Sequence, residues 1–318
     1  MKLERRNSLV WQRRTLIATA AAAGSFFAGL FLPLGANSEL TNSVKFFFNF
    51  NNQPKAALSL DSPVLMAQSE KVVGGLFPLL ESLEKEEKAA LLKLSVPPLF
   101  QGKTINSVPL NTQQKFIALT FDDGPWPNST NNILYILKKY NIKATFFLLG
   151  QNVQNFPALA QQIANHGHAL GNHTWNHPYH NHNEAAAAKQ IDNTSAIIHK
   201  TTGIQPFLFR PPGGYLHNGL SAYANRKNQV TVMWSADSKD YHASAPNLAR
   251  NVLSQATPGG IVLLHDGGGD RTQTSLALPQ IITELQNQGY QFVTVPELMQ
   301  LKAQEQLPPI TPKSTSGG

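Results

Sequence analysis

The chain has 318 residues, of which 42% are hydrophobic, and it contains no cysteine. This length accommodates one large α/β domain and a smaller region, and the apolar content is sufficient for a full core. The lack of cysteine excludes disulfides, thiolate metal ligands and a cysteine nucleophile. Histidine and carboxylate side chains would therefore have to hold any metal ion.

The net charge of +7 is concentrated at the N-terminus. Residues 1–38 contain five lysines and arginines against one glutamate, which gives +4 and leaves +3 for the rest of the chain. After residue 38 the sequence has no basic cluster of the size that nucleic-acid binding needs. The charge distribution therefore predicts no nucleic-acid partner.

The N-terminal segment predicts export from the cytoplasm. An uncharged run at 15–34 follows the basic stretch, as in a secretory signal or an uncleaved membrane anchor. The pair Arg13-Arg14 also allows a twin-arginine signal. In each case the basic end of the segment stays in the cytoplasm. We expect the rest of the chain in the periplasm or cell envelope, either secreted or anchored to the membrane by residues 1–38.

Two further regions flank the predicted main domain. Residues 39–110 are expected to form a linker or stalk, in which 76–94 has the apolar spacing of an amphipathic helix. Residues 302–318 are rich in Pro, Ser, Thr and Gly, which predicts a disordered tail. The main domain is thus expected at 111–301.

Within 111–301, strand and helix patterns alternate about seven times. Short apolar runs rich in β-formers occur at 116–121, 144–150, 168–173, 207–210, 230–235, 261–266 and 292–295. Segments with helical spacing, such as 131–141 and 157–167, lie between them. Alternation of this kind is typical of βα units around a parallel sheet. We favour a closed or nearly closed barrel of seven such units over an open sheet.

Polar residues follow most of these predicted strands. They are Asp122, Asp123, His173, His177, Arg210, Asp237, Asp240, His265 and Asp266. In a βα barrel the C-terminal ends of all strands share one face, which carries the chemistry. Any one of these residues taken alone would pass for a loop residue, and we interpret Asp237 and Asp266 as turn or cap residues. Their repeated position after strands predicts a site.

The adjacent carboxylates Asp122 and Asp123 admit several explanations. Like charges at close range raise one another's pKa, so a cation could lie between them or the two could have different roles. A solvated turn is the simpler alternative, because Asp, Gly and Pro are common turn residues. His173 and His177 are four residues apart, which puts both on one side of a helical turn. Two histidines and a carboxylate leave positions open for water and substrate, as metal-assisted hydrolysis requires.

Five motifs, in this order, resemble those of polysaccharide deacetylases, the NodB-homology enzymes of carbohydrate esterase family 4. They are TFDDGP, HTWNHP, RPPGGY, DSKDY and LLHD. The resemblance covers residues 115–298 and implies that the α/β domain is a distorted (β/α)7 barrel. It also implies that Asp123, His173 and His177 bind one divalent metal, which we expect to be Zn²⁺, with Co²⁺, Ni²⁺ or Mn²⁺ as alternatives.

The same resemblance implies roles for the remaining polar residues. Asp122 resembles the general base that activates water, and Arg210 resembles the arginine that orients it. His265 resembles the general acid that protonates the departing amine. Asp240 resembles the partner that raises the pKa of His265.

Three residues are expected to bind substrate. Leu263 matches the leucine that lines the acetyl methyl pocket, and a backbone N–H of the Gly213 turn is expected to bind the oxyanion. The family often has an aromatic residue directly after Arg-Pro-Pro, where this chain has Gly213. Its stacking role is either lost or moved to Tyr215. Similarly, Tyr241 stands where the family commonly has tryptophan.

These observations predict a metal-dependent N-deacetylase of an extracytoplasmic polysaccharide, acting as a monomer. N-acetylglucosamine residues of peptidoglycan are the first expected substrate. An N-acetylated exopolysaccharide, chitin and O-acetylated xylan are alternatives. A non-catalytic glycan-binding module is the competing class, although such a module would need neither an acid nor a base.

Overall fold

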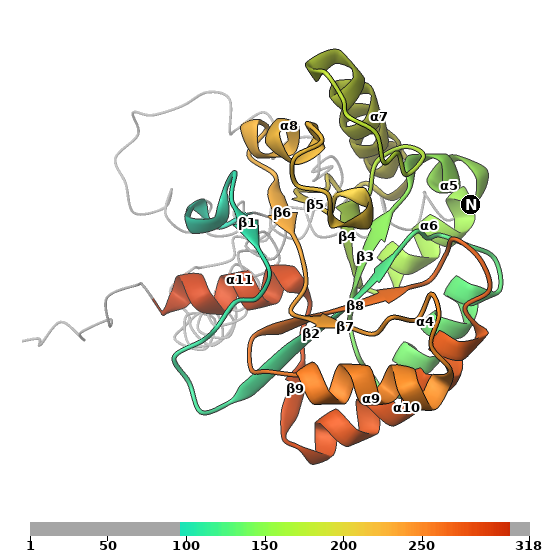
Figure 1. The fold of residues 1–318 in the computed structure, drawn as a ribbon, viewed down its shortest axis with the longest axis vertical. Coiled ribbons are helices and arrows are strands. Elements are labelled where there is room, and N and C mark those ends of the chain that lie inside the picture. Colours follow the sequence, from blue (N-terminus) through green and yellow to red (C-terminus); the bar gives the residue numbers. More distant parts are fainter. Residues whose placement is uncertain (1–95, 306–318) are drawn as a thin grey trace, which may run out of the picture. The chain divides into compact units, whose positions relative to one another are not determined.

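The computed structural model describes residues 96–305, which belong to one compact unit of the chain (Figure 1). The predicted signal or anchor segment, the predicted helix 76–94 and the final residues of the tail lie outside the described residues. No helix within 96–305 is long and apolar enough to cross a membrane.

A nine-stranded parallel sheet forms the centre of the described region. The strands are β1 (Thr104–Ile105), β2 (Lys115–Asp122), β3 (Thr145–Leu148), β4 (Ala169–Asn172), β5 (Leu208–Phe209), β6 (Val230–Val232), β7 (Ala236–Asp237), β8 (Gly260–His265) and β9 (Tyr290–Phe292). Their order is β1-β6-β5-β4-β3-β2-β8-β7, and β9 pairs with β2. Every named pair is parallel, which confirms the predicted α/β class.

The sheet is strongly curled. Strands β6 and β7 lie towards opposite ends of the strand order, yet residues 233–235 suffice to join them. The segment after β1 also reaches β8 through an antiparallel bridge between Ser107 and Gly260. The strand pairs nevertheless form an open path rather than a ring within 96–305. The result is a curled parallel half-barrel, consistent with the predicted seven-unit barrel.

Helices follow most of the strands (Figure 1). They are α4 (Ser129–Lys139), α5 (Gly150–Asn155), α6 (Pro157–Asn165), α7 (Glu184–Thr202), α8 (Leu220–Arg226), α9 (Ala245–Gln255), α10 (Thr272–Asn287) and α11 (Val295–Gln304), with the short 3-10 turns η1 (Pro98–Phe100) and η2 (Pro212–Gly214). The predicted helices 131–141 and 157–167 correspond to α4 and α6. Most predicted boundaries agree with the structure to within two residues.

The C-terminal end of the domain differs from the expectation. The predicted strand 292–295 and the predicted tail from 302 are both shortened by α11. Thr294 begins this helix because its hydroxyl accepts from the Glu297 N–H while the Glu297 carboxylate accepts from the Thr294 N–H. This capping box and a proline in the first turn favour helix over strand from Val295 onward.

Strand β2 separates two apolar clusters, because successive side chains of a strand point to opposite faces. Ile117, Leu119 and Phe121 pack in the cluster that contains residues of α4, α6, α9 and α10. Phe116 and Ala118 pack in the cluster that contains residues of α11. The second cluster also includes Phe100 and Val108, so the packed structure begins before the boundary expected at residue 111.

Candidate active site

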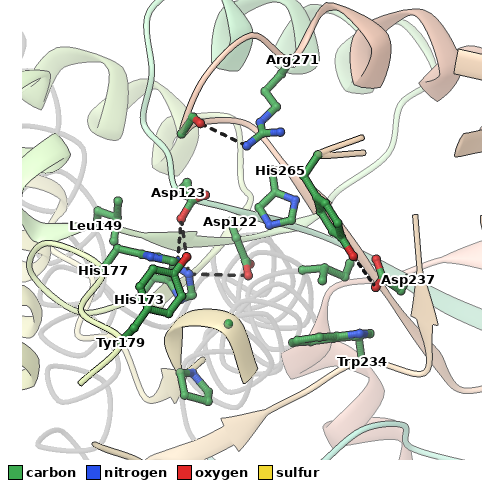
Figure 2. Close-up of a pocket in the computed structure, with 15 residues that line it drawn as sticks. Asp122, Asp123, Leu149, His173, His177, Tyr179, Trp234, Asp237, His265 and Arg271 are labelled. Carbon is green, nitrogen blue, oxygen red and sulfur yellow. Dashed lines mark hydrogen bonds and ion pairs between the residues drawn. The ribbon is translucent and has the colours of Figure 1, made fainter. Parts of the chain in front are cut away.

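The C-terminal end of β2 lies at the centre of the candidate site. Asp122 is the last residue of β2 and is paired in register with His265, the last residue of β8. His173 directly follows β4, and Arg210 directly follows β5. These side chains therefore meet at one edge, where Asp122, His173 and His265 line a cavity of ≈ 470 Å³ (Figure 2). This volume is typical of small-molecule sites.

A tight backbone turn orients the two aspartates. Asp123 has φ 72°, in the left-handed region that residues other than glycine seldom adopt. The Asn152 side chain donates a hydrogen bond of 2.7 Å to the Asp123 carbonyl and so holds the turn from α5. His177 has φ 58°. Backbone of this kind clusters at functional sites, where the surrounding structure enforces it.

Asp123, His173 and His177 form a three-donor set. Asp123 Oδ1 lies 3.5 Å from Nε2 of His173 and 3.5 Å from Nε2 of His177 (Figure 2). One ligand atom from each residue lies within 4.8 Å of the other two. Asp123 Oδ1 is buried and no group in the described residues hydrogen-bonds to it. Because an unsatisfied buried oxygen is costly, this set fits a divalent cation.

The tautomer of His173 suits a ligand. Its Nδ1 lies 2.7 Å from the Arg210 carbonyl oxygen, which can only accept, so Nδ1 carries the proton. The Nε2 lone pair is thereby left facing Asp123. Outer hydrogen bonds of this kind commonly orient metal-ligating histidines.

The protonation states also favour cation binding. Burial favours the neutral carboxyl of Asp123, but the contact with His173 and the charges of nearby histidines hold its pKa well below the usual range. Burial lowers the pKa of His177, and the neighbouring His173 lowers it further. For His173, Asp122 and Asp123 outweigh burial and raise the pKa. The carboxylate charges that raise this pKa would equally favour a metal cation, which would bind the Nε2 lone pair in place of a proton.

Asp122 is held on one side by a buried arginine. Its Oδ1 accepts a 2.8 Å hydrogen bond from Arg210, whose side chain is fully buried. The same guanidinium donates to the hydroxyl of Thr120 at 2.7 Å and to the carbonyl of Val232 at 2.9 Å. It also stacks on the Phe147 ring at 4.1 Å from the ring centroid. Oδ2 of Asp122 lies 3.8 Å from His173 Nε2, so the two carboxylate oxygens have different surroundings.

His265 and Asp240 form a second pair, in which Asp240 is buried and His265 is partly exposed. Nδ1 of His265 lies 2.7 Å from Asp240 Oδ1, and the His265 backbone N–H donates to Oδ2 at 2.8 Å. The Thr274 hydroxyl also donates to Oδ2, at 2.9 Å. Burial disfavours the cationic imidazole, but the hydrogen bond and charge of Asp240 outweigh it and raise the pKa of His265 to about 9.

The three residues expected to bind substrate differ in whether they line the cavity. Leu263 and Gly213 line the cavity. Tyr215 is not part of the cavity lining, but its ring packs edge-on against Tyr179, which is. Tyr215 is therefore connected to the cavity through Tyr179, a residue outside the five motifs.

Several residues near the site were missed or interpreted differently from the sequence. Asp237 lines the cavity as well as capping a turn, since its Oδ1 accepts from the Lys239 N–H. Asp266 lies in the bend after β8, as a turn residue would, but it is fully buried, and burial raises its pKa to about 7. Tyr179 and Arg271 line the cavity from segments without a distinctive pattern.

Comparisons with known proteins agree with this arrangement. The polysaccharide deacetylase family profile matches residues 110–233. A peptidoglycan-N-acetylglucosamine deacetylase of Bacillus cereus is 43% identical over 216 residues, which cover 67% of this chain and 99% of that protein. A solved peptidoglycan N-acetylglucosamine deacetylase has a TM-score of 0.59 and 39% identity, covering 63% of this chain and 94% of the other.

Similarity also extends to an inactive relative. The structure of a CE4 family pseudoenzyme from Bacillus anthracis has a TM-score of 0.57 and 30% identity, covering 62% of this chain and 68% of the other. The fold alone is thus compatible with loss of activity. Taken with the match to the Bacillus cereus protein along nearly its whole length, these similarities show that the chain belongs to the polysaccharide deacetylase family.

Proposed function

We propose that the protein is a metal-dependent N-deacetylase that removes acetyl groups from N-acetylglucosamine residues of peptidoglycan. One observation carries the proposal. A single cavity brings together the donor set of Asp123, His173 and His177, the arginine-held carboxylate of Asp122 and the carboxylate-backed imidazole of His265. A non-catalytic glycan-binding module would have no use for all three.

Asp123, His173 and His177 would hold the metal ion, for which zinc suits a set with two imidazoles. Cobalt, nickel or manganese fits the same donors. When bound, such an ion polarises the acetyl carbonyl and makes a water molecule more acidic.

Asp122 is the general base. Arg210 holds its Oδ1, so the proton of the attacking water passes to Oδ2. Arg210 is itself fixed by its hydrogen bonds to Thr120 and Val232, so it sets the direction in which the Asp122 carboxylate points. Attack on the acetyl carbon converts the planar amide to a tetrahedral oxyanion, which the Gly213 backbone N–H binds. Leu263 provides the apolar contact for the methyl group.

His265 is the general acid. An amide anion is a very poor leaving group, so the nitrogen must be protonated as the carbon–nitrogen bond breaks. With a pKa of about 9, His265 is protonated at neutral pH and can donate to that nitrogen. Asp240 stabilises the imidazolium cation of His265 until the proton is transferred. Acetate leaves, and a free amine remains on the sugar.

The proposed location outside the cytoplasm rests on the uncharged run at 15–34 behind the basic N-terminus. Peptidoglycan is the N-acetylated polymer at that location, and it is the substrate in the name of the Bacillus cereus relative. The membrane is a partner only through this run, if it is uncleaved. We propose that the enzyme acts as a monomer.

Reporter fusions test the proposed location. An alkaline phosphatase fused after residue 110 should be active, whereas a cytosolic reporter at the same point should be silent.

Measurement of released acetate tests the proposal. The full chain, supplied with zinc, is incubated with peptidoglycan, chitin, an acetylated exopolysaccharide and O-acetylated xylan. We expect release from peptidoglycan, and release that depends on Asp122 when Asp122→Asn is compared. Release from only one of the other polymers would reassign the substrate. Glycan binding without any release would favour the non-catalytic alternative.

A further inference from the structure

Arg271 places a positive charge in the wall of the cavity. It directly precedes α10, and it lines the cavity together with Asp123 and His265 (Figure 2). Only 8% of its surface is exposed. Because a guanidinium stays protonated in proteins, this charge is permanent. The proposed reaction assigns it no role.

The loop after β8 fixes the direction of the guanidinium. Nε of Arg271 donates to the Gly267 carbonyl at 2.7 Å, and Nη2 donates to the Gly268 carbonyl at 3.3 Å. Gly268 has φ 72°, and a Cβ there would lie 2.7 Å from Asp123 Oδ2 and 3.4 Å from Arg271 Nη2. The loop thus holds the cation near the donor set, with no side chain at 268 between them.

This cation has no counter-ion among residues 96–305. The two glycine carbonyls are the only hydrogen-bond partners of the Arg271 side chain there, and no carboxylate forms an ion pair with it. By contrast, the buried Arg210 pairs with Asp122 at 2.8 Å. Burying a cation without an opposite charge is costly, so a site of this kind gains stability from binding an anion.

The carboxylates that line the cavity have other partners. Asp122 is held by Arg210, and Asp123 Oδ1 faces the two histidines of the donor set. Asp237 Oδ1 accepts from the Lys239 N–H at 2.8 Å. None of them contacts the guanidinium directly, so a counter-ion would come from the ligand.

A carboxylate on the substrate suits this position, because the guanidinium fork matches the geometry of a carboxylate. In peptidoglycan, N-acetylglucosamine alternates with muramic sugars that carry a lactyl ether. That ether ends in a carboxylate or is joined to a peptide with carboxylates of its own. Chitin carries no charged group. A peptidoglycan strand whose N-acetylglucosamine occupies the cavity therefore brings a carboxylate on the neighbouring sugar.

We propose that Arg271 binds a carboxylate carried by the muramic sugar next to the N-acetylglucosamine that is deacetylated. The contact favours peptidoglycan over uncharged N-acetylated glycans such as chitin. This inference rests on the proposed function, since it names the group that selects among the polymers considered there.

The test uses the zinc-loaded full chain and three forms of one peptidoglycan tetrasaccharide. The first has free lactyl carboxylates, the second has neutral methylamides in their place, and the third bears a dipeptide that ends in a carboxylate. Released acetate gives kcat/KM for each. In the wild type, at least one charged form should exceed the methylamide by about tenfold or more, the scale of a hydrogen bond to a charged group. The charged form that shows this preference identifies the source of the carboxylate.

Substitution of Arg271 should remove the preference. In Arg271→Gln the ratio of kcat/KM between the charged form and the methylamide should fall to near one, because glutamine carries no charge. Arg271→Lys keeps the charge without the planar fork and should recover part of the ratio. Arg250→Gln removes an exposed arginine on α9, so it is the matched control and should keep the wild-type ratio.

The ratio separates recognition from a purely structural role of Arg271 in the loop. A disturbed loop would slow all three substrates alike and release zinc, which is measured for each variant. That outcome, or a wild type without any preference for charge, would overturn the inference. If the wild type releases no acetate from any form, the proposed function fails. Calorimetric binding of the same three forms to the wild type and Arg271→Gln then decides the inference by the same ratio.

Discussion

Asp122 and His265 are paired in register at the C-terminal ends of β2 and β8. This pairing places the proposed base and the proposed acid at the same edge of the sheet. Each is backed by an oppositely charged buried partner, Arg210 behind Asp122 and Asp240 behind His265. The two proton-transfer groups are therefore positioned by strand register and by separate ion pairs, which can be perturbed one at a time.

Asp240→Asn should shift the pH dependence of activity. Asp240 raises the pKa of His265 to about 9, so its neutralisation should lower that pKa. The acid works only when protonated. A lower pKa therefore means that activity is lost at a lower pH. The alkaline limb of the kcat/KM profile should shift to lower pH. Rates measured between about pH 6 and 10 check this. An alkaline limb that stays in place would show that His265 is not the acid.

Arg210→Met should destabilise the protein. The substitution leaves the Asp122 carboxylate buried without its cation, which typically costs about 3–5 kcal/mol of unfolding free energy. Adding Asp122→Asn to that variant removes the unpaired charge and should recover part of the loss. The unfolding free energies of the wild type, the two single variants and the double variant, measured in urea, form a double-mutant cycle. Strictly additive losses would contradict the proposed coupling.

His168 predicts an acid-sensitive component of stability away from the reaction centre. It is buried, and its Nδ1 accepts the Ala144 N–H at 3.1 Å. Burial, aided by the charges of Lys143 and His166, lowers its pKa from 6.5 to about 3. Between these values the unfolded chain binds a proton that the folded chain does not, so stability falls as the pH falls.

The expected loss from His168 between pH 7 and pH 5 is on the order of 2 kcal/mol. His168→Asn keeps an acceptor for the Ala144 N–H but cannot titrate. Its unfolding free energy should therefore fall less than that of the wild type over this interval, when both are measured without metal. Equal losses in the two proteins would show that His168 is not the source.

The residues at strand ends could be predicted because two simple rules locate them. Apolar runs mark the strands, and parallel strands bring their C-terminal ends to one edge, so Asp122, His173 and His265 were expected together. The short strands β1 and β7 escaped this reasoning, because neither lies in an apolar run like the one at 207–210 that marks the equally short β5. Their pairing depends on how the sheet curls.

Other parts of the site depend on tertiary contacts that the sequence does not encode locally. Thr274 reaches Asp240 because α10 packs against α9, the helix that follows Asp240 in the chain, and an isolated threonine in a helix gives no indication of this. Asp266 follows its strand much as Asp123 does, yet it is fully buried against Thr130. Tyr179 lines the cavity itself and packs against Tyr215, which belongs to a different loop. Sequence position alone could not distinguish these cases.

The most direct test of the account is a comparison of Asp122→Asn with Asp123→Asn, in both zinc content and deacetylation rate. Asp122→Asn keeps the three metal donors, so it should retain zinc while losing on the order of a hundredfold or more in rate. Asp123→Asn removes a charged ligand, so it should lose zinc and regain part of its rate when zinc is added. Little effect from either change would mean that both aspartates are turn residues. Loss of zinc from Asp122→Asn with retention in Asp123→Asn would contradict the assignment of base and ligand.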